Sequence, residues 1–135
     1  MRILVVDDEA MIRKLLRQAL EDSAHRVDEA ESGEAGIGAL QAGDYDLVIT
    51  DMVMPGMGGI ELIGIVTRVW PHIPVIAMSG GGRLGDEDHL QSAADLGAAA
   101  TVSKPFRLRD VRAAIERVRG GAAKKDDACG CSLAS

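Results

Sequence analysis

The chain has 135 residues, which suits a single domain, and 47% of them are hydrophobic, which excludes a disordered protein. The formal net charge of −6 argues against a nucleic-acid-binding protein, because such proteins carry a basic surface. The sequence contains no apolar run long enough to cross a membrane, and its first residues do not resemble a signal peptide. We therefore expect a cytoplasmic domain with neither a membrane nor a nucleic acid as its partner.

Short apolar runs alternate along the chain with segments of helical periodicity. The runs predict strands at residues 2–6, 26–30, 47–50, 75–78 and 100–103. The periodic segments predict helices at residues 10–22, 33–42, 59–69 and 86–96, and from 108 to the glycine pair at 120–121. Residues 121–135 lack periodicity and are expected to form a disordered tail, which leaves one domain at residues 1–120.

The alternation of strands and helices predicts an α/β fold with a parallel sheet covered by helices on both faces. The first, third and fourth strands are the most apolar, so they should lie in the centre of the sheet. The second and fifth strands are weaker and should lie at its edges. A flavodoxin-like, doubly wound (βα)5 fold with the strand order 2-1-3-4-5 meets both requirements.

Polar residues stand at the ends of four of the five expected strands. They are Asp7 and Asp8 after the first strand, Asp51 after the third, Ser79 after the fourth and Lys104 after the fifth. The second strand contributes nothing obvious. Taken singly, each acid is more simply explained as a helix cap, the serine as a turn residue and the lysine as a solvated charge. Because ligands bind at the carboxyl ends of the strands in such folds, their coincidence favours one functional pocket.

Three carboxylates in one pocket need compensation. Two carboxylates about 5 Å apart repel each other by roughly 3 kcal/mol at an effective dielectric constant of about 20. The ammonium group of Lys104 and a hard, oxygen-binding ion such as Mg²⁺ would offset this repulsion. One carboxylate can then attack phosphorus, and Asp51 is the best candidate because it comes from a central strand. The metal, Lys104 and Ser79 would each face an oxygen of the transferring phosphoryl group.

The same residues resemble the receiver domain of two-component response regulators. The motifs ILVVDDE, DLVITDMVMPGMGG, VIAMSG and SKPF occur in the family's order, and the resemblance covers residues 2–119. It implies a phospho-accepting signalling domain that is not an enzyme, beyond assisting its own phosphotransfer and autodephosphorylation.

Carried over position by position, the resemblance assigns a role to each motif residue. It makes Asp51 the phospho-acceptor and places Mg²⁺ among Asp7, Asp8, Asp51 and the backbone carbonyl of Val53. Ser79 becomes the hydroxyl that moves towards the phosphoryl group, and Lys104 the cation that pairs with it.

The resemblance also implies partners. A sensor histidine kinase or a histidine phosphotransfer protein would supply the phosphoryl group, and a downstream protein target would read the phosphorylated state. Too few residues follow residue 120 for an output domain, so we expect a stand-alone receiver that acts by protein–protein contacts or by phosphorelay.

The sequence departs from the family at Thr101, where an aromatic residue is usual. The coupled movement of hydroxyl and ring therefore cannot take its usual form. Ordering of the loop that begins with Gly80, Gly81 and Gly82 is an alternative hypothesis for the switch. Gly58 stands where the family commonly has an aspartate, which removes an acidic cap from the helix that follows.

Two other functions remain open. A Mg²⁺-dependent phosphohydrolase of the haloacid dehalogenase type also forms an aspartyl phosphate, but its two acids are separated by one residue, whereas Asp7 and Asp8 are adjacent. A phosphate-independent binding module would keep the fold without the chemistry. Thr101 leaves the second alternative open, while the complete set of acids, hydroxyl and lysine argues against it.

Overall fold

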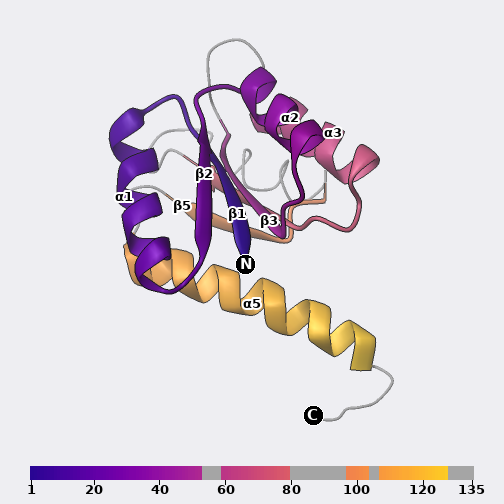
Figure 1. Cartoon of the computed structure of the whole chain (residues 1–135). Helices are drawn as coiled ribbons and strands as arrows, with labels where there is room; N and C mark the ends of the chain where they lie inside the picture. The colour runs from indigo at the N-terminus through magenta and orange to yellow at the C-terminus, as the bar shows by residue number, and fades with distance from the viewer. Residues whose placement is uncertain (53–58, 80–96, 104–106, 128–135) are drawn as a thin grey trace.

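A five-stranded parallel sheet forms the centre of the protein (Figure 1). The structure, a computed structural model, describes residues 1–52, 59–79, 97–103 and 107–127. The strands are β1 (Arg2–Val6), β2 (Arg26–Ala30), β3 (Leu47–Asp51), β4 (Val75–Ser79) and β5 (Ala100–Ser103). The described helices are α1 (Ala10–Asp22), α2 (Gly33–Ala42), α3 (Gly59–Val69) and α5 (Leu108–Asp127).

The strand order is β2-β1-β3-β4-β5, and all four neighbouring pairs are parallel. This confirms the predicted flavodoxin-like order. All five residues of β3 are buried, as are the last four of β1, whereas β2 at the edge begins with an exposed residue. The apolar strands therefore occupy the centre because that position removes both of their faces from water.

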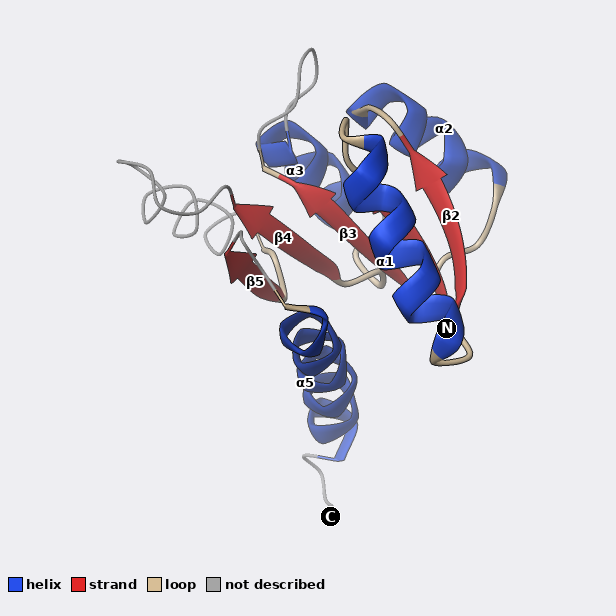
Figure 2. Ribbon diagram, turned by 90° about the vertical axis from the view of Figure 1, so that its left-hand side faces the viewer, coloured by secondary structure: helices blue, strands red, loops and turns tan. Residues whose placement is uncertain are grey.

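The helices cover the two faces of the sheet (Figure 2). Side chains alternate between faces along each strand, so Ile3 and Val5 belong to the buried cluster that includes residues of α1 and α5, while Leu4 and Val6 belong to the cluster that includes residues of α2 and α3. Each fully buried leucine or isoleucine contributes about 2 kcal/mol to the free energy of unfolding. Within the described residues, no helix combines the length and the apolar character that a bilayer span requires.

The predicted element boundaries differ from the structure in three places. β3 and β4 each include one more residue than predicted. Asp51 extends β3 because the amide of Met52 still donates to the carbonyl of Met78 at 2.8 Å, and Ser79 extends β4 because it pairs with Ser103 of β5. The predicted helix end at Gly120 is wrong, since α5 continues to Asp127. A helical glycine costs about 1 kcal/mol relative to alanine, and the sequence AAKK that follows the glycine pair consists of strong helix formers.

Two further expectations fall outside the described residues. They are the helix at residues 86–96 and the last part of the disordered tail, residues 128–135. The domain boundary at residue 120 stays a prediction.

A polar cluster ties β1, β2 and the loop before β3 together. The hydroxyl of Tyr45 donates to Oδ2 of Asp28 at 2.6 Å, and Nη2 of Arg2 donates to the same oxygen at 3.1 Å. The Arg2 guanidinium also lies over the Tyr45 ring, 4.6 Å from its centroid. The Tyr45 hydrogen bond, assisted by Arg2, lowers the pKa of Asp28, while burial and the bond to Asp28 raise the pKa of Tyr45.

This cluster predicts a specific pH dependence of stability. A carboxyl group whose pKa is lowered by folding stabilises the protein above its unfolded pKa of about 4, and the contribution is lost as the pH falls through the folded pKa. At pH 7, Asp28→Asn should lower the free energy of unfolding by about 1 kcal/mol. The difference from wild type should shrink below about pH 4.

Urea unfolding at pH 7 and at pH 3 measures this difference. Asp44→Asn is the matched control, because Asp44 is an exposed acid of the loop that carries Tyr45. A difference between wild type and Asp28→Asn that stays the same at both pH values would show that the Asp28 carboxylate does not contribute in this way.

Candidate functional site

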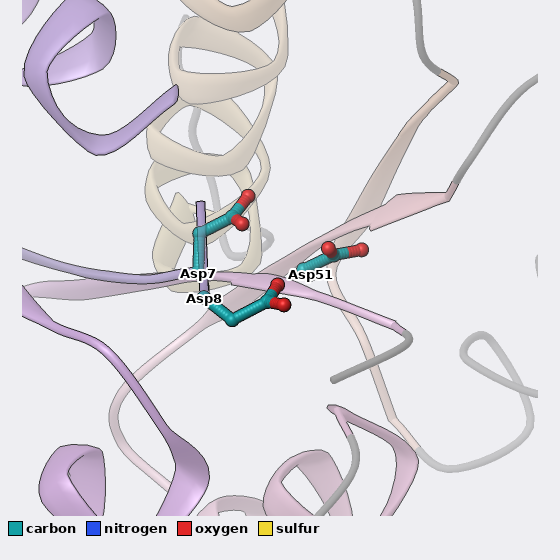
Figure 3. Close-up of side chains that lie close together, drawn as sticks. All are labelled: Asp7, Asp8 and Asp51. Carbon is teal, nitrogen blue, oxygen red and sulfur yellow. The ribbon is translucent and has the colours of Figure 1, made fainter. Parts of the chain in front are cut away.

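Three carboxylates from two neighbouring strands meet at the carboxyl edge of the sheet (Figure 3). Val6 of β1 pairs with Thr50 of β3, so Asp7, the next residue, is level with Asp51. One carboxylate oxygen from each of Asp7, Asp8 and Asp51 lies within 4.8 Å of the others. Asp7 is fully buried and Asp51 is 6% exposed, whereas Asp8 lies at the surface.

The backbone around Asp7 fixes the first part of this group. Its amide donates to the carbonyl of Ala30 at 3.1 Å, which continues the β1–β2 ladder by one residue. Its Oδ1 accepts the amide of Glu9 at 2.9 Å, and this contact turns the chain into α1. Asp7 therefore stabilises the turn before α1, although Glu9 and not Asp7 is the N-cap residue of that helix, and Asp7 is also a member of the acidic group.

A guanidinium group lies behind the acidic pair. Nη1 of Arg13 in α1 donates to the backbone carbonyl of Asp7 at 2.6 Å, and its Nε donates to Oε1 of Glu29 in β2 at 3.1 Å. Neither residue stands out in the sequence, where β2 showed nothing obvious. The signal that was present is weak: Glu29 stands two residues after the buried Val27, so both lie on the face of the sheet that α1 covers.

The described carboxylates are suited to a hard cation. Two of these charges at this separation repel by about 3 kcal/mol at an effective dielectric constant of about 20. Oxygens bound to one Mg²⁺ lie about 3 to 4 Å apart, because each Mg–O distance is about 2.1 Å. The oxygens of this group, all within 4.8 Å of one another, are close to that spacing. The residues present therefore fit an ion of this kind.

Of the remaining predicted site residues, the structure describes the backbone of Ser79 and Thr101. Ser79 ends β4 one residue beyond Met78, which pairs with Asp51, so the backbone brings Ser79 to the same edge. Thr101 lies in β5, where it pairs with Ala77 and is half-buried. Lys104 and the carbonyl of Val53 lie outside the described residues, as do Gly58 and the loop at residues 80–82.

Several known proteins are similar to this chain. It is 38% identical to the transcriptional regulatory protein ResD of Bacillus subtilis, over 82% of this chain and 44% of ResD. The chain therefore spans less than half the length of that relative. It is 33% identical to sporulation initiation phosphotransferase F of B. subtilis, over 86% of this chain and 91% of the relative.

One solved structure is similar to this chain in both fold and sequence. Response regulator protein TrrA from Thermotoga maritima, in complex with Mg²⁺-BeF, superimposes with a TM-score of 0.74 at 31% identity. The match covers 87% of this chain and 97% of TrrA.

The match to a protein family spans most of the domain. Residues 3–116 match the family described as the response regulator receiver domain. This range contains β2 to β5, all of β1 except Arg2, and the three carboxylates that meet at the edge of the sheet. The chain therefore belongs to the receiver domains of two-component response regulators, a family of signalling domains.

Proposed function

We propose that this receiver domain accepts a phosphoryl group on Asp51 with the help of a bound Mg²⁺ ion. The observation that carries the proposal is the group of three carboxylates within 4.8 Å of one another, in a chain of this family. A phosphohydrolase, which the acids alone left open, finds no support in the family match.

Asp51 is the acceptor because of its place in the sheet. β3 lies between β1 and β4, so Asp7 and Asp8 flank Asp51 on one side and Ser79, the last residue of β4, lies on the other. Asp7 is fully buried and already holds the amide of Glu9, which makes it a poor nucleophile for a bulky phosphoryl donor. Asp8 lies at the surface beside the other two acids.

Asp7, Asp8 and Asp51, together with the carbonyl of Val53, would hold the metal. Bound Mg²⁺ supplies positive charge opposite the oxygens of the phosphoryl group. Asp7 and Asp8 come from one strand end and Asp51 from the next, so the register of the sheet brings the acceptor and the two flanking acids together. The similar protein TrrA was solved with Mg²⁺-BeF, which supports this ion for the family.

The transfer is a single displacement at phosphorus. One carboxylate oxygen of Asp51 forms a bond to phosphorus while the bond from phosphorus to the donor's imidazole nitrogen breaks. The electron pair of the broken bond stays on that nitrogen, which is then protonated. In the proposal, Lys104 pairs with the phosphoryl group and the hydroxyl of Ser79 donates to one of its oxygens.

A histidine kinase or a histidine phosphotransfer protein is the proposed donor, and a protein target reads the result. Two relatives carry names that fit this proposal, one a transcriptional regulator and the other a phosphotransferase. Ser79 and Thr101 remain the proposed switch residues. Action as a stand-alone receiver in the cytoplasm stays a prediction.

Intact mass after incubation with Mg²⁺ and acetyl phosphate tests the acceptor. The wild type should gain one base-labile phosphoryl unit and Asp51→Asn none, because the amide is not nucleophilic. Asp44→Asn, an exposed acid before β3, should be labelled like the wild type. Labelling of Asp51→Asn to the wild-type extent would place the acceptor elsewhere. Absence of any adduct, with Mg²⁺ binding shown separately, would favour a phosphate-independent binding module.

Calorimetric titration with Mg²⁺ tests the metal site. Asp8→Asn should weaken Mg²⁺ binding by about tenfold or more, because each 1.4 kcal/mol of lost attraction is a factor of ten. Without Mg²⁺, the same change should raise the free energy of unfolding, since it relieves repulsion among the carboxylates. An Asp8→Asn variant with wild-type Mg²⁺ affinity would remove Asp8 from the site.

A further inference from the structure

Arg13 connects the acidic site to the edge strand of the sheet. Its guanidinium group spans two elements, with Nη1 on the carbonyl of Asp7 at 2.6 Å and Nε on Oε1 of Glu29 at 3.1 Å. The other carboxylate oxygen of Glu29 accepts Nη1 of Arg17 at 3.1 Å. Both oxygens of Glu29 are therefore held, and Glu29 anchors the guanidinium group that holds Asp7.

We infer that Arg13 is a positioning residue of the metal and phosphorylation site, acting through the peptide bond between Asp7 and Asp8. This inference rests on the proposed function. The carbonyl of Asp7 belongs to that peptide, so a donor fixed to this oxygen fixes the plane of the peptide. The plane sets the direction in which Asp8 leaves the backbone. Its carboxylate must point at Asp51 for one ion to bind both.

The burial of the bridge supports a role in orientation. The side chains of Arg13 and Glu29 are 14% and 21% exposed, whereas those of Arg17 and Glu21, the next pair along α1, are 49% and 44% exposed. Exposed pairs are screened by water and contribute little. A shielded, charge-assisted bond is stronger and holds its geometry better. The guanidinium group also presents its donors in a rigid planar fork, whereas the donors of a lysine ammonium rotate on a flexible stem.

The charge of Arg13 and its contacts act on the metal in opposite directions. As a cation near the carboxylates, Arg13 repels Mg²⁺, so its removal should tighten binding if charge alone matters. If Arg13 holds the Asp7–Asp8 peptide in place, its removal should weaken binding. The sign of the change therefore separates the two effects.

The test is Mg²⁺ affinity, measured by calorimetric titration of the full chain. Arg13→Met keeps the apolar stem and should weaken Mg²⁺ binding by about tenfold, a typical loss for a residue that orients a metal ligand. Arg13→Lys keeps the charge without the fork and should lose a few-fold. Arg17→Gln is the matched control, since Arg17 holds Glu29 without touching Asp7, and it should bind Mg²⁺ like the wild type.

Amide hydrogen exchange in the metal-free protein gives a second readout. The amide of Glu9 donates to Oδ1 of Asp7. If loss of Arg13 loosens this turn, the amide hydrogen of Glu9 should exchange faster in Arg13→Met than in Arg17→Gln. The central amides of β1 and β3 should keep their protection. A general loss of protection would mean that Arg13 stabilises the whole fold and would overturn the inference.

The remaining outcomes are also decisive. Arg13→Met with equal or tighter Mg²⁺ binding than wild type would overturn the positioning role and leave the proposed function intact. A wild-type protein that binds no Mg²⁺ would overturn both, and the exchange rate of Glu9 would then report on a purely structural bridge. Weaker Mg²⁺ binding in Arg13→Met, with unchanged protection in the central strands, is the expected result.

Discussion

The structure depends on the register between β1 and β3. Pairing of Val6 with Thr50 brings Asp7 level with Asp51, and both carboxylates are almost completely removed from water. Like charges in that position repel by about 3 kcal/mol. The two strands tolerate the cost because their other residues are buried on both faces, and each buried aliphatic side chain contributes about 2 kcal/mol. The core therefore fixes the strand ends that bring the acids together, which is the arrangement that a binding site for a cation needs.

The sheet could be predicted from the sequence because its strands differ so clearly in polarity. The run LVIT at residues 47–50 has no face that tolerates water, which forces it to the centre, whereas RVDEA at residues 26–30 carries charges and suits an edge. Strand order then decides which ends meet. Asp7, Asp8 and Asp51 were expected together for this reason, and the structure brings them together.

Other features could not be predicted from the same pattern. The glycine pair at residues 120–121 is a common helix end, but the propensity of single residues is overridden by the residues that follow, and α5 continues to Asp127. The hydrogen bond from Arg13 to the carbonyl of Asp7 depends on the direction in which the long arginine side chain leaves α1. Spacing along the sequence gives the face of a helix and leaves the reach of a guanidinium group undetermined.

The two acids of β2 also bind side chains of neighbouring elements. Asp28 and Glu29 are adjacent, so they lie on opposite faces of the sheet. Asp28 binds Tyr45 and Arg2 on the face of α2 and α3, while Glu29 binds Arg13 and Arg17 on the face of α1. Charges also protect an edge strand against pairing with another chain. Arg13 therefore joins this edge of the sheet to the Asp7–Asp8 peptide by two direct hydrogen bonds.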